Sequence, residues 1–272
     1  MVVLTNTMFN FLKKNKPIAR FYSLEEGLAD VYPIIPTSAV KRPWLKTPNN
    51  PHPNDGNIST KNCPGINLMF NAGWVLTAPA DFVITTNGDG VDFNYIEAER
   101  FHLEKPPGQE KYIDFHDQNQ TERILDDPDK SLKTVIKMHT PWRVELDDDY
   151  LLLQTPVHYT NEKRFTPATG LIDPRYAHVL NVQLFWHVLN GEELVRAGTP
   201  LVQYIPVPRN AYISSHFNFI CDEANENDRK LERSFNYTLR SVIYKYDSLK
   251  SRLVKVRKVI DKYRSNLSLI HI

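Results

Sequence analysis

The sequence is poor in cysteine, in long apolar runs and in net charge. Its 272 residues include only two cysteines, Cys63 and Cys221, which are too few for a disulfide framework, and no Cys/His spacing is typical of a zinc site. We therefore expect a reducing compartment and neither a metal nor another cofactor. No apolar run approaches the roughly 20 residues that cross a bilayer, so we expect no membrane partner. The formal net charge of +1 indicates no class of partner.

Motifs of several large enzyme classes are also missing. The sequence has no P-loop, no dinucleotide-binding fingerprint and no nucleophile elbow for Ser-His-Asp catalysis. At the N-terminus, Phe9, Phe11 and Leu12 come before Lys13 and Lys14, an order opposite to that of a signal peptide. We expect a soluble protein that is not secreted by a signal peptide.

The clearest strand pattern covers residues 178–188, which read HVLNVQLFWHV. Two sets of residues alternate there, so that Leu180 and Trp186 fall on one side and His187 on the other. This period of two is typical of a half-buried strand. Asn190-Gly191 then predicts a turn, because both residues tolerate positive φ.

Three further strands are predicted around this one. Residues 134–146 and 150–156 have strand patterns, and the acidic triplet at 147–149 predicts a solvated turn between them. Another strand follows Gly198 and ends at Pro206, since proline cannot donate to a strand ladder. Four strands with short polar connections indicate an antiparallel sandwich or barrel.

Composition divides the chain into parts. We expect an N-terminal arm over residues 1–17, or a short docking helix there, followed by a β domain over 18–210. Within that domain, residues 36–64 are proline-rich and predict a long loop, which is either functional or an arm that wraps a neighbour. A connector over 211–226 leads to a helix over 227–272.

Two strands are predicted in residues 73–86, and another begins at residue 91. The intervening Asn87-Gly88-Asp89-Gly90 is a strong signal for a hairpin turn. Residues 97–129 are polar and predict an excursion with one strand near 112–115.

The C-terminal stretch from residue 227 contains no proline or glycine. Its apolar residues recur with alternating spacings of four and three, which is specific for a coiled coil. A helix lying on the β domain is the alternative, but it would favour a period of 3.6 and a wider apolar stripe. A hairpin is disfavoured because no glycine or proline breaks the helix. We expect a homo-oligomer, either a dimer or a trimer. The heptad-core positions are Phe235, Leu239, Val242, Tyr246, Leu249, Leu253, Val256, Ile260, Tyr263, Leu267 and Ile270.

Charge is unevenly distributed along the chain. Residues 226–264 contain 12 Lys/Arg against 5 Asp/Glu, which leaves 21 basic and 27 acidic residues elsewhere. The basic helix fits contact with nucleic acid or with an acidic partner, and it also fits the solvated outer face of a coiled coil. We favour the solvated face.

Histidines at 139, 158, 178 and 187 all fall in the predicted β region. A cupin-like metal site needs His and Glu on neighbouring strands that point into a barrel. His139 and Glu145 are six residues apart, close to some cupin spacings, but the sequence contains no His-x-His pair. A cupin-like metal or small-molecule site is therefore kept as a second alternative function.

The stretch Gly170-Leu171-Ile172-Asp173-Pro174-Arg175-Tyr176 resembles the third motif of trimeric dUTPases, G-x-I-D-x-x-Y. Residues 198–205 are similar to the strand G-x-x-I-x-Q-x-I that closes the barrel in dUTPases and dCTP deaminases. The resemblance covers residues 156–206. It implies that Asp173 orients an attacking water and that Tyr176 stacks on a base. His178, which stands where the family has a glycine, completes the candidate binding residues.

The chain departs from the dUTPase pattern at several points. Val157-His158 replaces the phosphate-binding Arg-Ser pair, and no glycine-rich C-terminal lid is present. Without phosphate-binding groups, pyrophosphate hydrolysis lacks its electrostatic stabilisation. We therefore favour the interpretation that Asp173-Pro174 is a turn and that Tyr176 is a core residue.

Several short stretches also resemble an uncharacterised β-domain family of phages and bacteria, over residues 42–208. The family implies no activity, but it implies a phage setting, with the host cytoplasm or the virion as the location and other virion proteins as partners. The stretches are Arg42-Pro43-Trp44, Cys63-Pro64, Asn71-Ala72-Gly73-Trp74 with Pro79, Tyr150-Leu151-Leu152-Leu153 with Pro156, Gly170 to Tyr176, and Thr199-Pro200 to Pro206.

These observations predict a mainly β chain. We expect an antiparallel β-sandwich or barrel, dUTPase-like or jelly-roll in its second half, followed by a C-terminal coiled coil. The predicted function is that of a non-enzymatic, oligomeric structural or binding protein of the phage type. A dUTPase-like protein that binds or hydrolyses nucleotides is the alternative.

Overall fold

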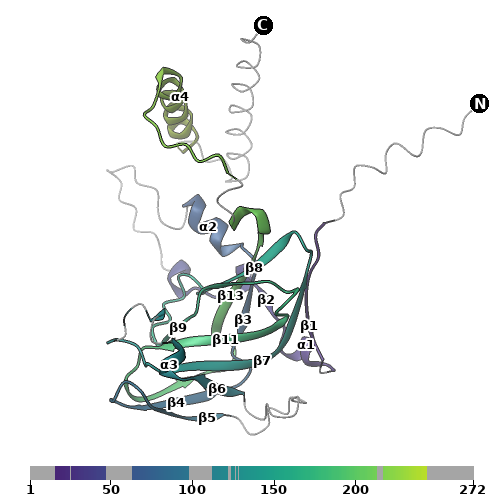
Figure 1. Ribbon diagram of the computed structural model, residues 1–272. Helices are drawn as coiled ribbons and strands as arrows, with labels where there is room; N and C mark the ends of the chain where they lie inside the picture. The colour runs from purple at the N-terminus through teal and green to yellow at the C-terminus, as the bar shows by residue number, and fades with distance from the viewer. Residues whose placement is uncertain are drawn as a thin grey trace, which may run out of the picture. The chain divides into compact units, whose positions relative to one another are not determined.

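The computed structural model describes residues 16–24, 26–46, 63–97, 112–121, 124–125, 127, 129–212 and 217–243 (Figure 1). The chain divides into two compact units, residues 1–216 and 217–272. Every strand of the described residues belongs to the first unit, and helix α4 belongs to the second.

Three antiparallel sheets build the first unit. The first sheet has the order β1-β7-β11-β9, and β6 also pairs with β7: β1 (Ala19–Ser23), β6 (Ile113–His116), β7 (Val135–Leu146), β9 (Phe165–Pro167) and β11 (Val179–Trp186). The second has the order β10-β8-β13-β3-β2: β2 (Ile35–Pro36), β3 (Trp74–Thr77), β8 (Tyr150–Thr155), β10 (Gly170–Ile172) and β13 (Pro200–Pro208). The third has the order β12-β4-β5: β4 (Phe82–Asn87), β5 (Phe93–Glu97) and β12 (Asn190–Val195).

Short helices lie between the strands or, for the last of them, follow β13. They are α1 (Leu28–Val31), η2 (Thr37–Ala39), η3 (Pro43–Lys46), α2 (Pro64–Phe70), α3 (Gln118–Thr121) and η6 (Arg209–Tyr212). The first part of the predicted loop 36–64 is therefore helical in two places. Its residues 47–62, and residues 1–15 of the predicted arm, lie outside the described residues.

One hydrophobic core is shared by the three sheets. Leu184 of β11, Tyr204 of β13 and Ile84 of β4 all belong to it, and none of the three side chains is exposed. Trp186 stacks on Phe165 with 6.0 Å between ring centroids. Because burial of apolar surface is the main driving force of folding, this shared core holds the sheets in one unit.

The alternation predicted for residues 178–188 is confirmed in β11. Leu180, Val182 and Leu184 are buried, whereas Asn181 and Gln183 are only half-buried on the other face. The turns predicted at 147–149 and 87–90 are also confirmed. The first leads from β7 to β8 and is closed by a hydrogen bond from the Tyr150 N–H to the Asp147 carbonyl, and the second joins the antiparallel strands β4 and β5.

The described strands form open sheets, and none of these sheets closes into a barrel. The mainly β, antiparallel class is thus confirmed, and the barrel alternative is wrong. The turn predicted at Asn190-Gly191 is wrong as well. Those residues begin β12, which pairs with β4, so that β11 and β13 enter different sheets. Residues 190–193 are polar and do not show a strand pattern, and their partner strand β4 lies far away in the sequence.

Strand β7 runs through a proline. β6 pairs with it as far as Met138, and β1 pairs with it from Trp142, so Pro141 falls between these two partners on one edge. A residue without an N–H is tolerated where no partner strand needs a donor. At the same level on the other edge, the register with β11 shifts and the Thr140 hydroxyl donates to the Leu180 carbonyl.

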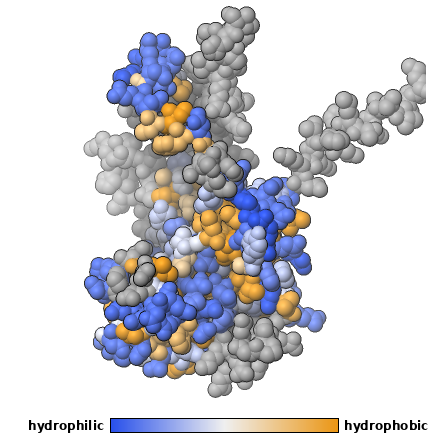
Figure 2. All heavy atoms as spheres, in the orientation of Figure 1, coloured by the Kyte–Doolittle hydropathy of each residue, from blue (hydrophilic) through white to orange (hydrophobic). Residues whose placement is uncertain are grey.

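The second unit is described over residues 217–243. Helix α4 spans Glu226–Ile243, so the predicted helix is confirmed in this part and begins one residue earlier. The heptad positions from Tyr246 onward lie outside the described residues. In Figure 2 the coloured surface of this unit has both hydrophilic and hydrophobic residues. Phe217, Phe219 and Ile220 are all more than half exposed. No helix in the described part of the chain is long and apolar enough to cross a membrane.

Candidate functional site

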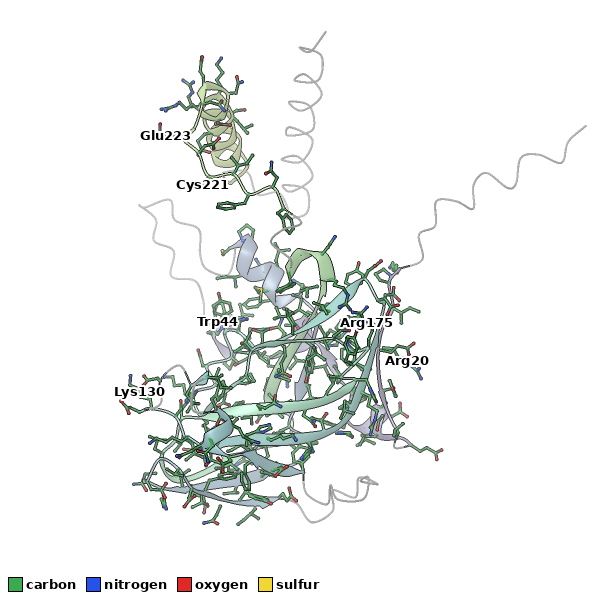
Figure 3. All side chains as sticks on the ribbon, in the orientation of Figure 1. Arg20, Trp44, Lys130, Arg175, Cys221 and Glu223 are labelled. Carbon is green, nitrogen blue, oxygen red and sulfur yellow. The ribbon has the colours of Figure 1, made fainter. Side chains whose placement is uncertain are left out.

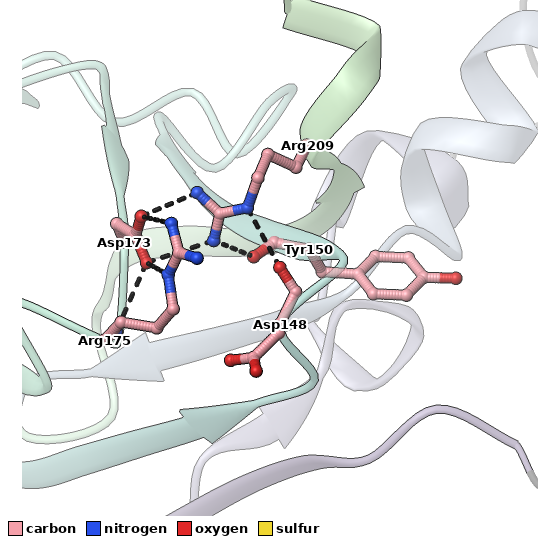
Figure 4. A network of polar contacts seen from close by, with 5 residues as sticks. All are labelled: Asp148, Tyr150, Asp173, Arg175 and Arg209. Carbon is pink, nitrogen blue, oxygen red and sulfur yellow. Dashed lines mark hydrogen bonds and ion pairs between the residues drawn. The ribbon is translucent and has the colours of Figure 1, made fainter.

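Asp173 follows strand β10 and forms a polar network in the first unit (Figure 4). Arg175 donates from Nε to one carboxylate oxygen at 3.1 Å and from Nη2 to the other at 2.8 Å. Arg209 donates from Nη1 and Nη2 to the same two oxygens, at 2.6 and 3.1 Å. One carboxylate therefore accepts two guanidinium groups, each in a bidentate arrangement.

Arg209 also binds the turn between β7 and β8. Its Nε donates to the Asp148 carbonyl at 2.9 Å, and its Nη2 donates to the Tyr150 carbonyl at 3.3 Å. Its main-chain N–H donates to the Asp149 carbonyl at 2.8 Å. Arg209 follows directly on β13, so the network fixes the end of that strand against the β7–β8 turn and the β10–β11 connection.

The charges around Asp173 decide its chemistry. Arg175 first, and Arg209 second, hold the pKa of the Asp173 carboxyl well below its ordinary value. In return, Asp173 raises the pKa of Arg175. A carboxylate that resists protonation, and whose oxygens are both occupied by cations, is poorly suited to act as a general base. The geometry favours a structural role for Asp173.

Tyr176 lies in the same turn as Asp173, but its side chain is 84% exposed. Its N–H donates to the Asp173 carbonyl at 2.9 Å, and the Arg175 guanidinium lies 5.5 Å from its ring centre. The turn predicted at Asp173-Pro174 is therefore present, and the interpretation of Tyr176 as a core residue is wrong, because the turn directs its ring outward. His178 is exposed too, and its carbonyl accepts a hydrogen bond from Val144 at 2.9 Å.

The Asp173 network is expected to make stability depend on pH. Since the pKa of Asp173 is lower in the folded than in the unfolded chain, the network stabilises the fold above the unfolded pKa of about 3.9 and loses this contribution as the pH falls below it. We expect Asp173→Asn to lower the free energy of unfolding at pH 7 by about 1 kcal/mol, a value reduced for solvent screening. Chemical denaturation at neutral and acidic pH measures both effects.

Asp148→Asn provides the control for this prediction. Asp148 belongs to the same network through its carbonyl oxygen, which the substitution keeps, and its side chain is exposed. We expect little change at either pH. Equal losses for the two variants would show that general surface charge, rather than the two arginines, explains the effect.

A cavity of about 380 Å³ lies at the ends of β9 and β11. Thr166 of β9 stands opposite Phe185 of β11, and His187 follows two residues later on the same side. Leu125, Asp127, Lys130 and Ser131, from the segment before β7, line the rest of the cavity. Figure 3 labels Lys130 and Arg175 on opposite sides of the first unit, so the cavity is remote from the Asp173 network.

His187 lies between two hydroxyl groups. Its Nδ1 is 3.0 Å from Ser131 Oγ, and its Nε2 is 2.7 Å from Thr166 Oγ1. Burial lowers the pKa of His187, and a hydrogen bond to the Lys130 backbone and the Asp127 charge partly oppose this shift. The imidazole is therefore neutral at pH 7, with one nitrogen as donor and the other as acceptor.

The hydroxyls of Ser131 and Thr166 therefore have opposite roles toward the ring. One donates its proton to the unprotonated nitrogen, and the other accepts from the ring N–H and keeps its own proton as a donor. At the rim, Lys130 Nζ lies 2.7 Å from Asp127 Oδ2, and both side chains face solvent.

The strand pattern placed His187 on the side opposite Leu180 and Trp186 but did not indicate its partners. Thr166 lies 21 residues before it, and Ser131 lies 56 residues before it. The one available signal was the alternation of residues 178–188, which put Phe185 and His187 on the same side.

The two residues considered for a cupin-like site, His139 and Glu145, each form an ion pair with another residue. His139 pairs with Asp114 at 3.2 Å, and Glu145 pairs with Arg20 at 3.1 Å. In the described residues no group of three or more His, Cys, Asp or Glu side chains could hold a metal ion.

Comparison with known proteins finds no matching family model and no matching curated protein. Among solved structures, the native dUTPase of EIAV matches with a TM-score of 0.28 and 13% identity, over 57% of this chain and 85% of that chain. A likeness this weak carries no argument about fold or function, so the function of this chain has to be argued from its own residues.

Proposed function

We propose that this chain is a non-enzymatic, oligomeric structural or binding protein of the phage type, such as a component of a virion. In this proposal a jelly-roll or dUTPase-like β-sandwich is joined to a coiled coil that assembles two or three copies. The carrying observation is the run of heptad-core residues that starts within α4 and continues to Ile270.

Exposed apolar side chains support assembly through the second unit. Phe219, in the segment that leads to α4, is 86% exposed. Leu231, in the first half of α4, is 53% exposed. Apolar groups that remain in contact with water are costly, and a partner chain would cover them.

The state of Asp173 supports the non-enzymatic part of the proposal. The dUTPase-like alternative requires this carboxylate to orient water, but Arg175 and Arg209 occupy both of its oxygens. A nucleotide would have to displace two ion pairs before Asp173 became available.

Charged substitutions in the heptads test the assembly. In the full chain, we expect Leu249→Asp combined with Leu253→Asp to convert the oligomer to single chains, because unpaired carboxylates would be buried at adjacent core positions. Light scattering gives the mass of each species, and the mass of the unmodified chain decides between dimer and trimer.

The matched control is Ser251→Asp. Position 251 lies between the two leucines in sequence but on the outer side of a heptad helix, so the same charge would remain in water. We expect its mass to equal that of the unmodified chain. A monomeric unmodified chain, or an oligomer that survives both leucine substitutions, would contradict assembly through the helix.

A further inference from the structure

We propose that the cavity around His187 binds one ring of a neutral sugar. The site lies in the first unit and uses no residue of the helix, so it goes beyond the assembly proposed above and can be tested without it. Four features of the cavity point to this ligand: its size, its mixed walls, its zero net charge and the donor–acceptor pair at its rim.

The size of the cavity limits the ligand to a small molecule. Its volume of about 380 Å³ is near the lower end of the range of about 300–1,000 Å³ that is usual for ligand pockets. A single six-membered sugar ring fits this volume. Leu125 and Phe185 supply apolar walls, and an aromatic ring suits the C–H face of a pyranose.

The interior polar groups call for a ligand that can both donate and accept hydrogen bonds. One of the two hydroxyls, Ser131 or Thr166, donates to His187 and keeps acceptor capacity, whereas the other accepts from His187 and keeps its donor. A purely apolar ligand would remove both hydroxyls from water without replacing their hydrogen bonds, which is unfavourable. Sugar hydroxyls satisfy donors and acceptors at once.

The rim has a matching pair of groups. Asp127 can only accept hydrogen bonds and Lys130 can only donate them, and the two charged atoms lie 2.7 Å apart. Neighbouring hydroxyls on a sugar can donate to the carboxylate and accept from the ammonium. The two charges cancel and His187 is neutral, so the site has no counter-ion for a charged ligand, which favours a neutral one.

The test measures binding of methyl pyranosides to the full chain by saturation-transfer NMR, with the glucose, galactose, mannose and N-acetylglucosamine forms as probes. We expect at least one to bind with a Kd on the order of 1 mM. Asp127→Asn should weaken this binding about tenfold, because it removes a hydrogen bond to a charged group. Phe185→Leu keeps apolar volume but removes the ring, and it should weaken binding too.

Asp129→Asn is the matched control, because Asp129 is an exposed carboxylate of the same segment that does not line the cavity. We expect it to bind sugar normally. The proposal is overturned if no pyranoside binds, if Asp127→Asn leaves the binding unchanged, or if adenosine binds in this cavity while the pyranosides do not. Asp127 is a surface residue, so its substitution leaves the fold intact and any loss of binding reports on the site. Loss of oligomers in the heptad variants would leave sugar binding unaffected, which separates the two proposals.

Discussion

Replacing Gly73 by alanine is expected to lower the free energy of unfolding by about 3 kcal/mol or more. Gly73 has a φ of 64°, in the left-handed region that disfavours any residue with a Cβ. A Cβ at this position would lie 1.9 Å from the carbonyl oxygen of Tyr204 and 2.9 Å from its carbonyl carbon. Both atoms belong to the backbone of β13, which is held between β8 and β3 and cannot move aside without breaking those pairings.

Gly27→Ala is the control for this substitution. Gly27 has a similar φ of 75°, but a Cβ there would meet no atom within 4 Å. We expect it to cost only the backbone strain, about 1 kcal/mol. Urea denaturation of the two variants and the unmodified chain then separates strain from collision. If Gly73→Ala cost no more than Gly27→Ala, the close approach to Tyr204 would not be a constraint on the fold.

The surroundings of Gly73 explain why the chain makes this tight approach. The Gly73 carbonyl accepts a hydrogen bond from the Thr37 N–H at 3.1 Å. The neighbouring Ala72 carbonyl accepts from the Thr37 hydroxyl at 2.7 Å and from Gln203 Nε2 at 2.7 Å. Thr37 and Gln203 are fully buried, so this turn supplies acceptors that two buried polar residues need.

A second group of buried and half-buried residues packs beside this turn. The guanidinium of Arg42 lies 4.2 Å from the ring centre of Phe70, and it donates to the carbonyls of Thr37, Val40 and His158. Burial lowers its pKa. Trp44 donates from Nε1 to the Tyr159 carbonyl at 2.8 Å. Short stretches that are far apart in the sequence thus meet at one place and have structural roles there.

Local periodicity accounts for what could be predicted from the sequence. The alternation over residues 178–188 reports which side chains face the core, because a strand places successive side chains on opposite faces. The helical pattern after residue 226 and the turn at 147–149 are equally local. Each depends on residues within a few positions of one another, so each could be read from the sequence.

Pairings between distant residues could not be read in this way. Arg209 lies 36 residues from Asp173, and Ser131 lies 56 residues from His187. Neither separation follows from a period of two or 3.6; both depend on which strands become neighbours. The pairing of β12 in the third sheet illustrates this. Its partner β4 lies about 100 positions earlier, and no turn sequence indicates that the two strands pair.

Replacing Trp186 by alanine is expected to lower the free energy of unfolding by about 4 kcal/mol. Trp186 is fully buried and stacks on Phe165 at the point where β11 meets β9. Its removal would leave a large space that the surrounding sheets cannot fill. Phe185→Ala is the control, because Phe185 is the next aromatic residue along the strand and is only half-buried on the opposite face. We expect it to cost clearly less in urea denaturation.

Replacing Trp186 by phenylalanine should lower the free energy of unfolding by far less than the loss of side-chain volume suggests. Among the described residues the buried indole N–H of Trp186 has no hydrogen-bond partner, and an unsatisfied buried donor costs about 1–3 kcal/mol. Phenylalanine removes that donor and keeps a ring against Phe165, so the gain offsets much of the loss in packing. We expect a net cost of about 1 kcal/mol. A loss as large as that of Trp186→Ala would mean that the N–H is bonded in solution, and that a polar group reaches the shared core.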